Sequence, residues 1–147
     1  MRTMGNRDNR ILSRELVLDA LPENLPKVQS FVTELLEQAA CPMKNLMQID
    51  VIVEEVFVNI AHYAYGAGRG KAAVRVEVSG EPAAATITFT DRGMPYDPLA
   101  REDPDVTLPA DKRKIGGLGI FMTKKMMDEV HYEYRDGRNI LTLKKKL

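Results

Sequence analysis

Three short segments of the sequence carry groups that together could bind a nucleotide. Glu55 and Asn59 lie one helical turn apart in an apolar pattern of helical period, and Asp91 with Gly93 ends an alternating apolar stretch. The third segment is the glycine-rich run 116–119, which precedes another helical pattern. A carboxylate beside an amide suits proton acceptance and Mg²⁺, a carboxylate at a turn suits an exocyclic amine, and bare backbone amides suit phosphate.

The first segment places its polar groups on one side of a helix. At about 100° per residue, Glu55, Asn59 and His62 share one sector beside the apolar stripe, whereas Glu54 points away from it. Glu55 could therefore accept a proton from, or orient, an attacking hydroxyl, and the amide oxygen of Asn59 could ligate Mg²⁺. A solvated glutamate and a helix-surface asparagine are the ordinary alternative for this pair taken alone.

The second segment combines a carboxylate with a sharp turn. Asp91 ends a predicted strand, and Gly93 and Pro95 allow the chain to turn beneath a flat ligand. A carboxylate held there could accept a hydrogen bond from an amine such as that of adenine. An aspartate in a strand-end turn is also common without any ligand.

The third segment, Gly116-Gly117-Leu118-Gly119, opens a predicted helix whose first amides lack intrahelical partners. Those amides and the helix dipole could bind anionic oxygens, and the absent side chains would let phosphate approach closely. Lys114 just before it could reach the terminal phosphate, or could belong with Arg113 to a solvated charge run. A tight turn without a ligand remains the alternative.

The strands and helices that would position these segments can be predicted from the periodicity of the sequence. We expect strands over 11–18, 71–79, 85–90, 130–135 and 139–145, helices over 22–39, 44–65 and 118–130, and a lid over the proline-rich stretch 92–115. This order indicates an α+β fold: a two-layer sandwich with a mixed or antiparallel sheet and its helices on one face.

Composition narrows the class of protein. The 147 residues suffice for a single domain, expected over 10–147 after a flexible tail at 1–9. The 21 basic and 21 acidic residues balance, so net charge favours neither direct nucleic-acid binding nor an anionic membrane. The lone Cys41 and two histidines favour neither a disulfide nor a zinc site. Without the apolar run of a signal peptide or a membrane span, the chain is expected in the reducing cytoplasm.

Taken in this order, the three segments resemble the N, G1 and G2 boxes of the Bergerat-fold ATPases, the histidine kinase-like superfamily shared by gyrase, Hsp90, histidine kinases and MutL. More closely, Glu55-Val-Phe-Val-Asn59 and the runs 62–65, 91–98 and 116–130 are similar to those of the anti-sigma-factor serine/threonine-protein kinases of bacterial partner-switching systems. The resemblance covers residues 10–147, nearly the whole chain.

The resemblance assigns a role to each segment. It implies that Glu55 is the base for phosphoryl transfer, that Asn59 binds ATP through Mg²⁺, and that Asp91 binds adenine. It implies further nucleotide contacts at Gly93, Lys114, Gly116, Gly117, Leu118 and Gly119.

Two positions depart from the family pattern. Tyr63 stands where the family usually has a histidine, so His62 inherits no role. The late-strand threonine that helps position the family's adenine contact corresponds here to Asn139, with Thr142 as the alternative.

The function that the resemblance implies is an ATP-dependent protein serine/threonine kinase that phosphorylates an anti-sigma-factor antagonist of the STAS type and otherwise binds a sigma factor. An ATP/ADP-gated binding module without kinase activity is the alternative. A stand-alone histidine kinase core fits poorly, because no helical segment with a phospho-accepting histidine precedes the domain. Whether the chain forms a homodimer is left open.

Overall fold

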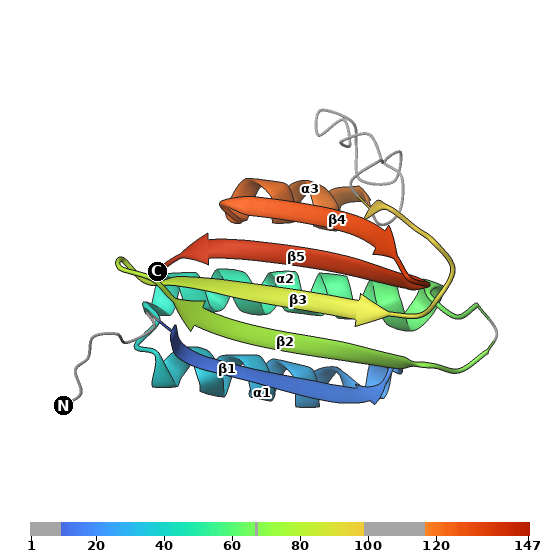
Figure 1. Cartoon of the computed structure of the whole chain (residues 1–147), viewed down its shortest axis with the longest axis horizontal. Helices are drawn as coiled ribbons and strands as arrows, with labels where there is room; N and C mark the ends of the chain where they lie inside the picture. The colour runs from blue at the N-terminus through green and yellow to red at the C-terminus, as the bar shows by residue number, and fades with distance from the viewer. Residues whose placement is uncertain (1–9, 67, 99–116) are drawn as a thin grey trace.

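The computed structural model describes residues 10–66, 68–98 and 117–147 as a two-layer sandwich (Figure 1). One layer is a five-stranded sheet of order β1-β2-β3-β5-β4, in which every neighbouring pair is antiparallel. The helices lie behind the sheet in the view of Figure 1, and no helix of the described ranges covers its other face. The α+β class predicted from the sequence is confirmed, and the sheet is antiparallel throughout.

The elements follow the chain in the expected order. A 3₁₀ turn, Pro22–Asn24, leads into the first helix. The bounds are β1 Arg10–Asp19, α1 Leu25–Gln38, α2 Met43–Tyr63, β2 Lys71–Ser79, β3 Ala84–Asp91, α3 Gly117–Met126, β4 Glu129–Arg135 and β5 Arg138–Lys146.

Helix α2 is the central helix of its layer and contacts both α1 and α3. Its buried side chains are apolar and extend around more than one side of the helix: Leu46, Ile49, Ile52, Val53, Val56 and Phe57. A helix that packs against the sheet and against two other helices must be apolar over a wide arc. Only a narrow part of the surface of α2 is therefore left for polar side chains.

The sheet shows the alternation expected of a half-buried layer. Along β2 and β3, every second residue is buried, and the intervening ones are partly or fully exposed. The inward residues, among them Val74, Val76, Ile87 and Phe89, join the helices in one core. The turn between β4 and β5 has Asp136 at φ 56° and Gly137 at φ 77°, the conformation that Asp-Gly favours in a two-residue hairpin.

The largest difference from a predicted boundary is at the end of the third helix. The helix expected over 118–130 ends at Met126, and β4 already begins at Glu129. The reason is tertiary, because Asp128 is bound to β5 at two points. Its N–H donates to the carbonyl of Lys144 (2.9 Å), and its carboxylate accepts from the N–H of Lys146 (2.6 Å). These bonds to the neighbouring strand override the helical period.

Helix α1 ends in a Schellman motif that lacks the usual glycine. The N–H of Cys41 donates to Leu36 O at 3.0 Å, and that of Ala40 to Glu37 O at 3.0 Å. Ala40 occupies the left-handed region at φ 60°, where an L-residue with a Cβ is disfavoured.

Ala40→Gly should therefore stabilise the fold by about 0.5–1 kcal/mol, because it removes this strain from an exposed position. Ala39→Gly is the matched control: Ala39 has φ −91°, so glycine there should cost about 0.5–1 kcal/mol. Urea unfolding of both variants measures the difference. Equal destabilisation by the two glycines would contradict the strain argument.

Candidate functional site

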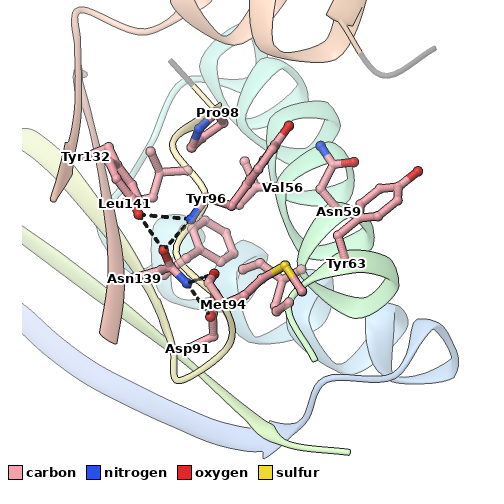
Figure 2. Close-up of a pocket in the computed structure, with 13 residues that line it drawn as sticks. Val56, Asn59, Tyr63, Asp91, Met94, Tyr96, Pro98, Tyr132, Asn139 and Leu141 are labelled. Atoms are coloured by element: carbon pink, nitrogen blue, oxygen red, sulfur yellow. Dashed lines mark hydrogen bonds between the residues drawn. The ribbon is translucent and has the colours of Figure 1, made fainter. Parts of the chain in front are cut away.

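A pocket opens where α2 ends, β3 ends and β5 begins (Figure 2). Its walls are mainly apolar, and its polar side chains apart from tyrosine are Asn59, Asp91 and Asn139, which come from three different elements. The full lining is Val56, Asn59, Ile60, Tyr63, Ala64, Phe89, Asp91, Met94, Tyr96, Pro98, Tyr132, Asn139 and Leu141. An apolar hollow with a few convergent polar groups is typical of a small-molecule site.

Helix α2 supplies the carboxylate and amide pair. Asn59 Nδ2 donates to Glu55 Oε2 at 3.1 Å, as expected for residues one turn apart. Because the amide nitrogen of Asn59 faces Glu55, its Oδ1 atom faces away from Glu55. No donor among the described residues reaches this oxygen, so it can accept a bond from another partner. Glu54 is exposed, as the helical spacing predicts. His62 is also exposed and contacts Tyr63 edge-on, with ring centroids 6.1 Å apart.

Asp91 lies on the floor of the pocket with 6% of its surface exposed. Its Oδ1 accepts two hydrogen bonds, from the Gly93 N–H at 2.8 Å and from Asn139 Nδ2 at 2.9 Å. No donor among the described residues reaches Oδ2. One oxygen of this carboxylate is thus bound by the protein, and the other can receive a donor from the pocket.

Asn139 stands directly opposite Asp91 in the register of β5 and β3. Its Oδ1 accepts from the Tyr96 N–H at 3.1 Å and makes a close contact with the Tyr132 hydroxyl, and its Nδ2 also donates to Met94 O at 2.8 Å (Figure 2). Thr142 lies three positions along the same strand and therefore points to the open face of the sheet. Of the two sequence candidates, only Asn139 meets Asp91.

The turn after β3 is held close to the end of α2. A Cβ on Gly93 would lie 2.0 Å from the Ala64 carbonyl oxygen, and the Met94 N–H donates to that same oxygen at 2.9 Å. The Tyr65 hydroxyl accepts from the Arg92 N–H at 2.8 Å and donates to Lys71 O. Gly93 is therefore required for the packing of this turn against the helix, whether or not a ligand is bound.

The glycine-rich segment is described only in part. Helix α3 begins at Gly117, so Gly117, Leu118 and Gly119 form its first turn. Helix α3 contacts α2, and in Figure 1 it begins at the end of the sandwich where β3 ends. Lys114, Gly116 and most of the predicted lid lie outside the described residues.

Two tyrosines contribute to the site without having been predicted from the sequence. Tyr96 and Tyr132 line the pocket and contact Asn139, and burial raises the pKa of the Tyr132 phenol. Around the mouth, Tyr63, Met94 and Tyr96 are 56%, 58% and 41% exposed. Such exposed apolar surface beside a pocket is typical of a binding site. Strand alternation indicates only the face on which Tyr132 lies, so no local pattern could have revealed its partner.

The described residues contain neither a ready-made metal cluster nor a membrane-spanning helix. No cluster of three or more His, Cys, Asp or Glu side chains there could hold a metal ion by itself. None of the helices in the described ranges has both the length and the apolar character needed to cross a membrane.

Two protein kinases are similar to this chain in sequence. The serine/threonine-protein kinase BtrW of Bordetella bronchiseptica is 27% identical over 95 residues, which cover 65% of this chain and 66% of the relative, just under two thirds of it. The serine-protein kinase RsbW of Listeria monocytogenes is 24% identical over 133 residues, or 88% of this chain and 84% of the relative.

A solved structure shares the fold. The crystal structure of the RsbU and RsbW domains of Rv1364c from Mycobacterium tuberculosis has a TM-score of 0.67 at 17% identity. The match covers 92% of this chain but 32% of the solved one, so the chain corresponds to about a third of that protein.

The description of the family model that matches residues 18–145 is "Histidine kinase-like ATPase domain". The likeness to anti-sigma-factor kinases seen in the motifs recurs in these relatives, the Bergerat fold predicted from the motifs is confirmed, and the protein belongs to the histidine kinase-like ATPase domain family.

Proposed function

We propose that this protein is an ATP-dependent serine/threonine kinase of a partner-switching system, which phosphorylates a STAS-type anti-sigma-factor antagonist and in its other state binds a sigma factor. The observation that carries the proposal is the Glu55–Asn59 pair beside a pocket whose floor is Asp91, one oxygen of which meets no donor among the described residues. The two relatives named above, a serine/threonine-protein kinase and a serine-protein kinase, support transfer to a hydroxyl.

The pocket would hold the nucleotide by its two ends. The adenine amine would donate to Asp91 Oδ2, and the exposed apolar side chains at the mouth would cover the base. The phosphates would extend toward the first turn of α3, where backbone amides at Gly116, Gly117, Leu118 and Gly119 would bind their oxygens. Lys114 is proposed as a further phosphate contact.

Asn59 fits the role of the protein ligand to Mg²⁺. Hydrogen bonding to Glu55 turns the amide nitrogen away and leaves its neutral oxygen available beside the pocket. Magnesium in such sites keeps several waters and takes substrate phosphates with one or two protein oxygens, so no larger acidic cluster is needed. When bound, the ion would neutralise charge on the phosphates.

Glu55 would act on the attacking hydroxyl. Its Oε2 is engaged by Asn59, and the carboxylate as a whole is half-buried on the helix face that Asn59 shares. It would accept the proton of the serine or threonine hydroxyl as the hydroxyl oxygen bonds to the γ-phosphorus of ATP and the bond from that phosphorus to the bridging oxygen breaks, so that ADP leaves. Phosphoryl transfer depends mainly on positioning and electrostatics, so a fixed base beside the metal ligand would suffice.

A kinase that binds a sigma factor works where transcription occurs, so we place the protein in the cytoplasm. Its partners would be the antagonist and the sigma factor, with neither a membrane nor direct contact with nucleic acid. A homodimer is compatible with this scheme, and sedimentation would reveal it.

Calorimetric titration tests the metal role. ATP should bind the wild type more tightly with Mg²⁺ than without, and Asn59→Ala should lose about tenfold to a hundredfold of the magnesium-dependent affinity. His62→Ala is the matched control, because His62 is exposed on the same helix, outside the pocket. Equal magnesium dependence in Asn59→Ala and the wild type would refute the assignment.

Radiolabelled transfer from ATP to a cognate antagonist tests the base. Glu55→Gln should slow transfer by about 10²–10⁴-fold with little change in ATP affinity. Glu54→Gln changes the neighbouring, exposed glutamate in the same way and should transfer at the wild-type rate. If the wild type binds ATP but leaves the mass of every antagonist unchanged, the protein is a nucleotide-gated binding module.

A further inference from the structure

Three consecutive lysines end strand β5, and the middle one faces the helices. Lys145 lies opposite Ala85 and two positions after Leu143, both of which are fully buried. Successive side chains of a strand point to opposite faces, so Lys144 and Lys146 lie on the face that no described helix covers. A cationic side chain on the packed face loses part of its hydration, which a hydrogen-bond partner has to replace.

The partner of Lys145 is the C-terminal end of helix α3. Lys145 Nζ donates to the carbonyl oxygen of Met126, the last residue of α3, at 2.6 Å. The last four carbonyls of a helix have no intrahelical partner, and the helix dipole places partial negative charge on them. An ammonium group is therefore a favourable partner for this end of the helix, and the bond is charge-assisted.

Two further hydrogen bonds hold the same end of α3 on β5. The N–H of Asp128 donates to Lys144 O at 2.9 Å, and its carboxylate accepts from the N–H of Lys146 at 2.6 Å. Met127, between the helix and Asp128, is buried in the core. The C-terminal end of α3 therefore has a defined place on the sheet, and the first turn of α3 lies at the opposite end of the helix (Figure 1).

Lys145 is too far from the first turn of α3 to touch a ligand there, because a helix of 10 residues is about 15 Å long. A hydrogen-bonded helix of this length moves as one body, so a shift at its C-terminal end also moves the amides of its first turn. Hydrogen bonds weaken once donor and acceptor leave the range of about 2.7–3.2 Å. A small displacement of α3 would therefore weaken the binding of phosphate oxygens.

We infer that Lys145 is a positioning residue for phosphate binding, which sets the place of the first-turn amides of α3 by fixing the opposite end of that helix on β5. The inference rests on the proposed nucleotide function. The described residues that line the pocket for the base come from α2, β3, β4, β5 and the segments after α2 and β3. Loss of the Lys145 contact should therefore weaken the phosphate contacts and spare those to the base.

Two ligands separate the phosphate contacts from the base contacts. ATP and adenosine share the base and the ribose, so the ratio of their dissociation constants in the presence of Mg²⁺ measures the contribution of the phosphates. NMR titration of the wild type should give ATP an affinity at least about a hundredfold higher. In Lys145→Met this ratio should fall by about threefold to tenfold, because the carbonyl of Met126 loses its charge-assisted donor.

Lys144→Met is the matched control at the neighbouring position. The Lys144 ammonium pairs with Glu129 at 3.8 Å between exposed side chains, so this variant should keep the wild-type ratio. Lys145→Arg can still donate to the same carbonyl and should keep most of the ratio. If Lys145 only stabilised the fold, Lys145→Met would weaken both ligands equally and leave the ratio unchanged. That outcome overturns the inference and leaves the proposed function intact.

A second variant covers the case in which Lys145→Met does not fold. Asp128→Ala removes the exposed carboxylate that accepts from the Lys146 N–H, and the ratio should fall in the same direction by a smaller factor. Where only Asp128→Ala folds, an unchanged ratio in that variant overturns the inference. Failure of the wild type to bind ATP, or equal affinity for ATP and adenosine, would overturn the proposed function and the inference together.

Discussion

The site depends on the antiparallel register of β3 and β5, which sets Asp91 opposite Asn139 at the end of the sheet. Buried apolar residues fix this register, because Phe89 opposite Leu141 and Ile87 opposite Leu143 share the face that packs on the helices. A slip of one residue would turn every side chain of a strand to the other face. The same core that stabilises the sheet therefore holds the carboxylate and the amide together.

Helix α2 brings the second half of the site to the same place. Its apolar arc is buried against the sheet and against both neighbouring helices, so its rotation about its own axis is fixed. The sector that remains carries Glu55 and Asn59 beside the pocket. Close packing of Gly93 on Ala64 then joins the helix end to the turn after β3. The polar groups of the site therefore lie on a packed helix and at the end of a packed strand, and such rigid elements hold a site in accurate geometry.

Much of the fold followed from local patterns. The strand over 71–79 has the predicted bounds, and the strands predicted over 130–135 and 139–145 are joined by a tight turn at Asp136-Gly137, because alternation and turn chemistry act within a few residues. The predicted end of helix α3 was wrong because Asp128 forms hydrogen bonds with β5, a strand that lies further along the chain. The three motifs indicated Glu55, Asn59 and Asp91, yet they did not indicate the contacts of Tyr132 and Tyr96 with Asn139, which join segments that are far apart along the chain or on neighbouring strands.

The sequence by itself determined the family, the order of elements and the types of polar groups at the site, because helical and strand periods and short motifs are properties of neighbouring residues. Tertiary structure alone decided between Asn139 and Thr142, and it decided which oxygen of Asp91 is engaged by the protein. Both results depend on which residues face each other across strands. Register arises from packing of the whole core, so no single segment of sequence contains it.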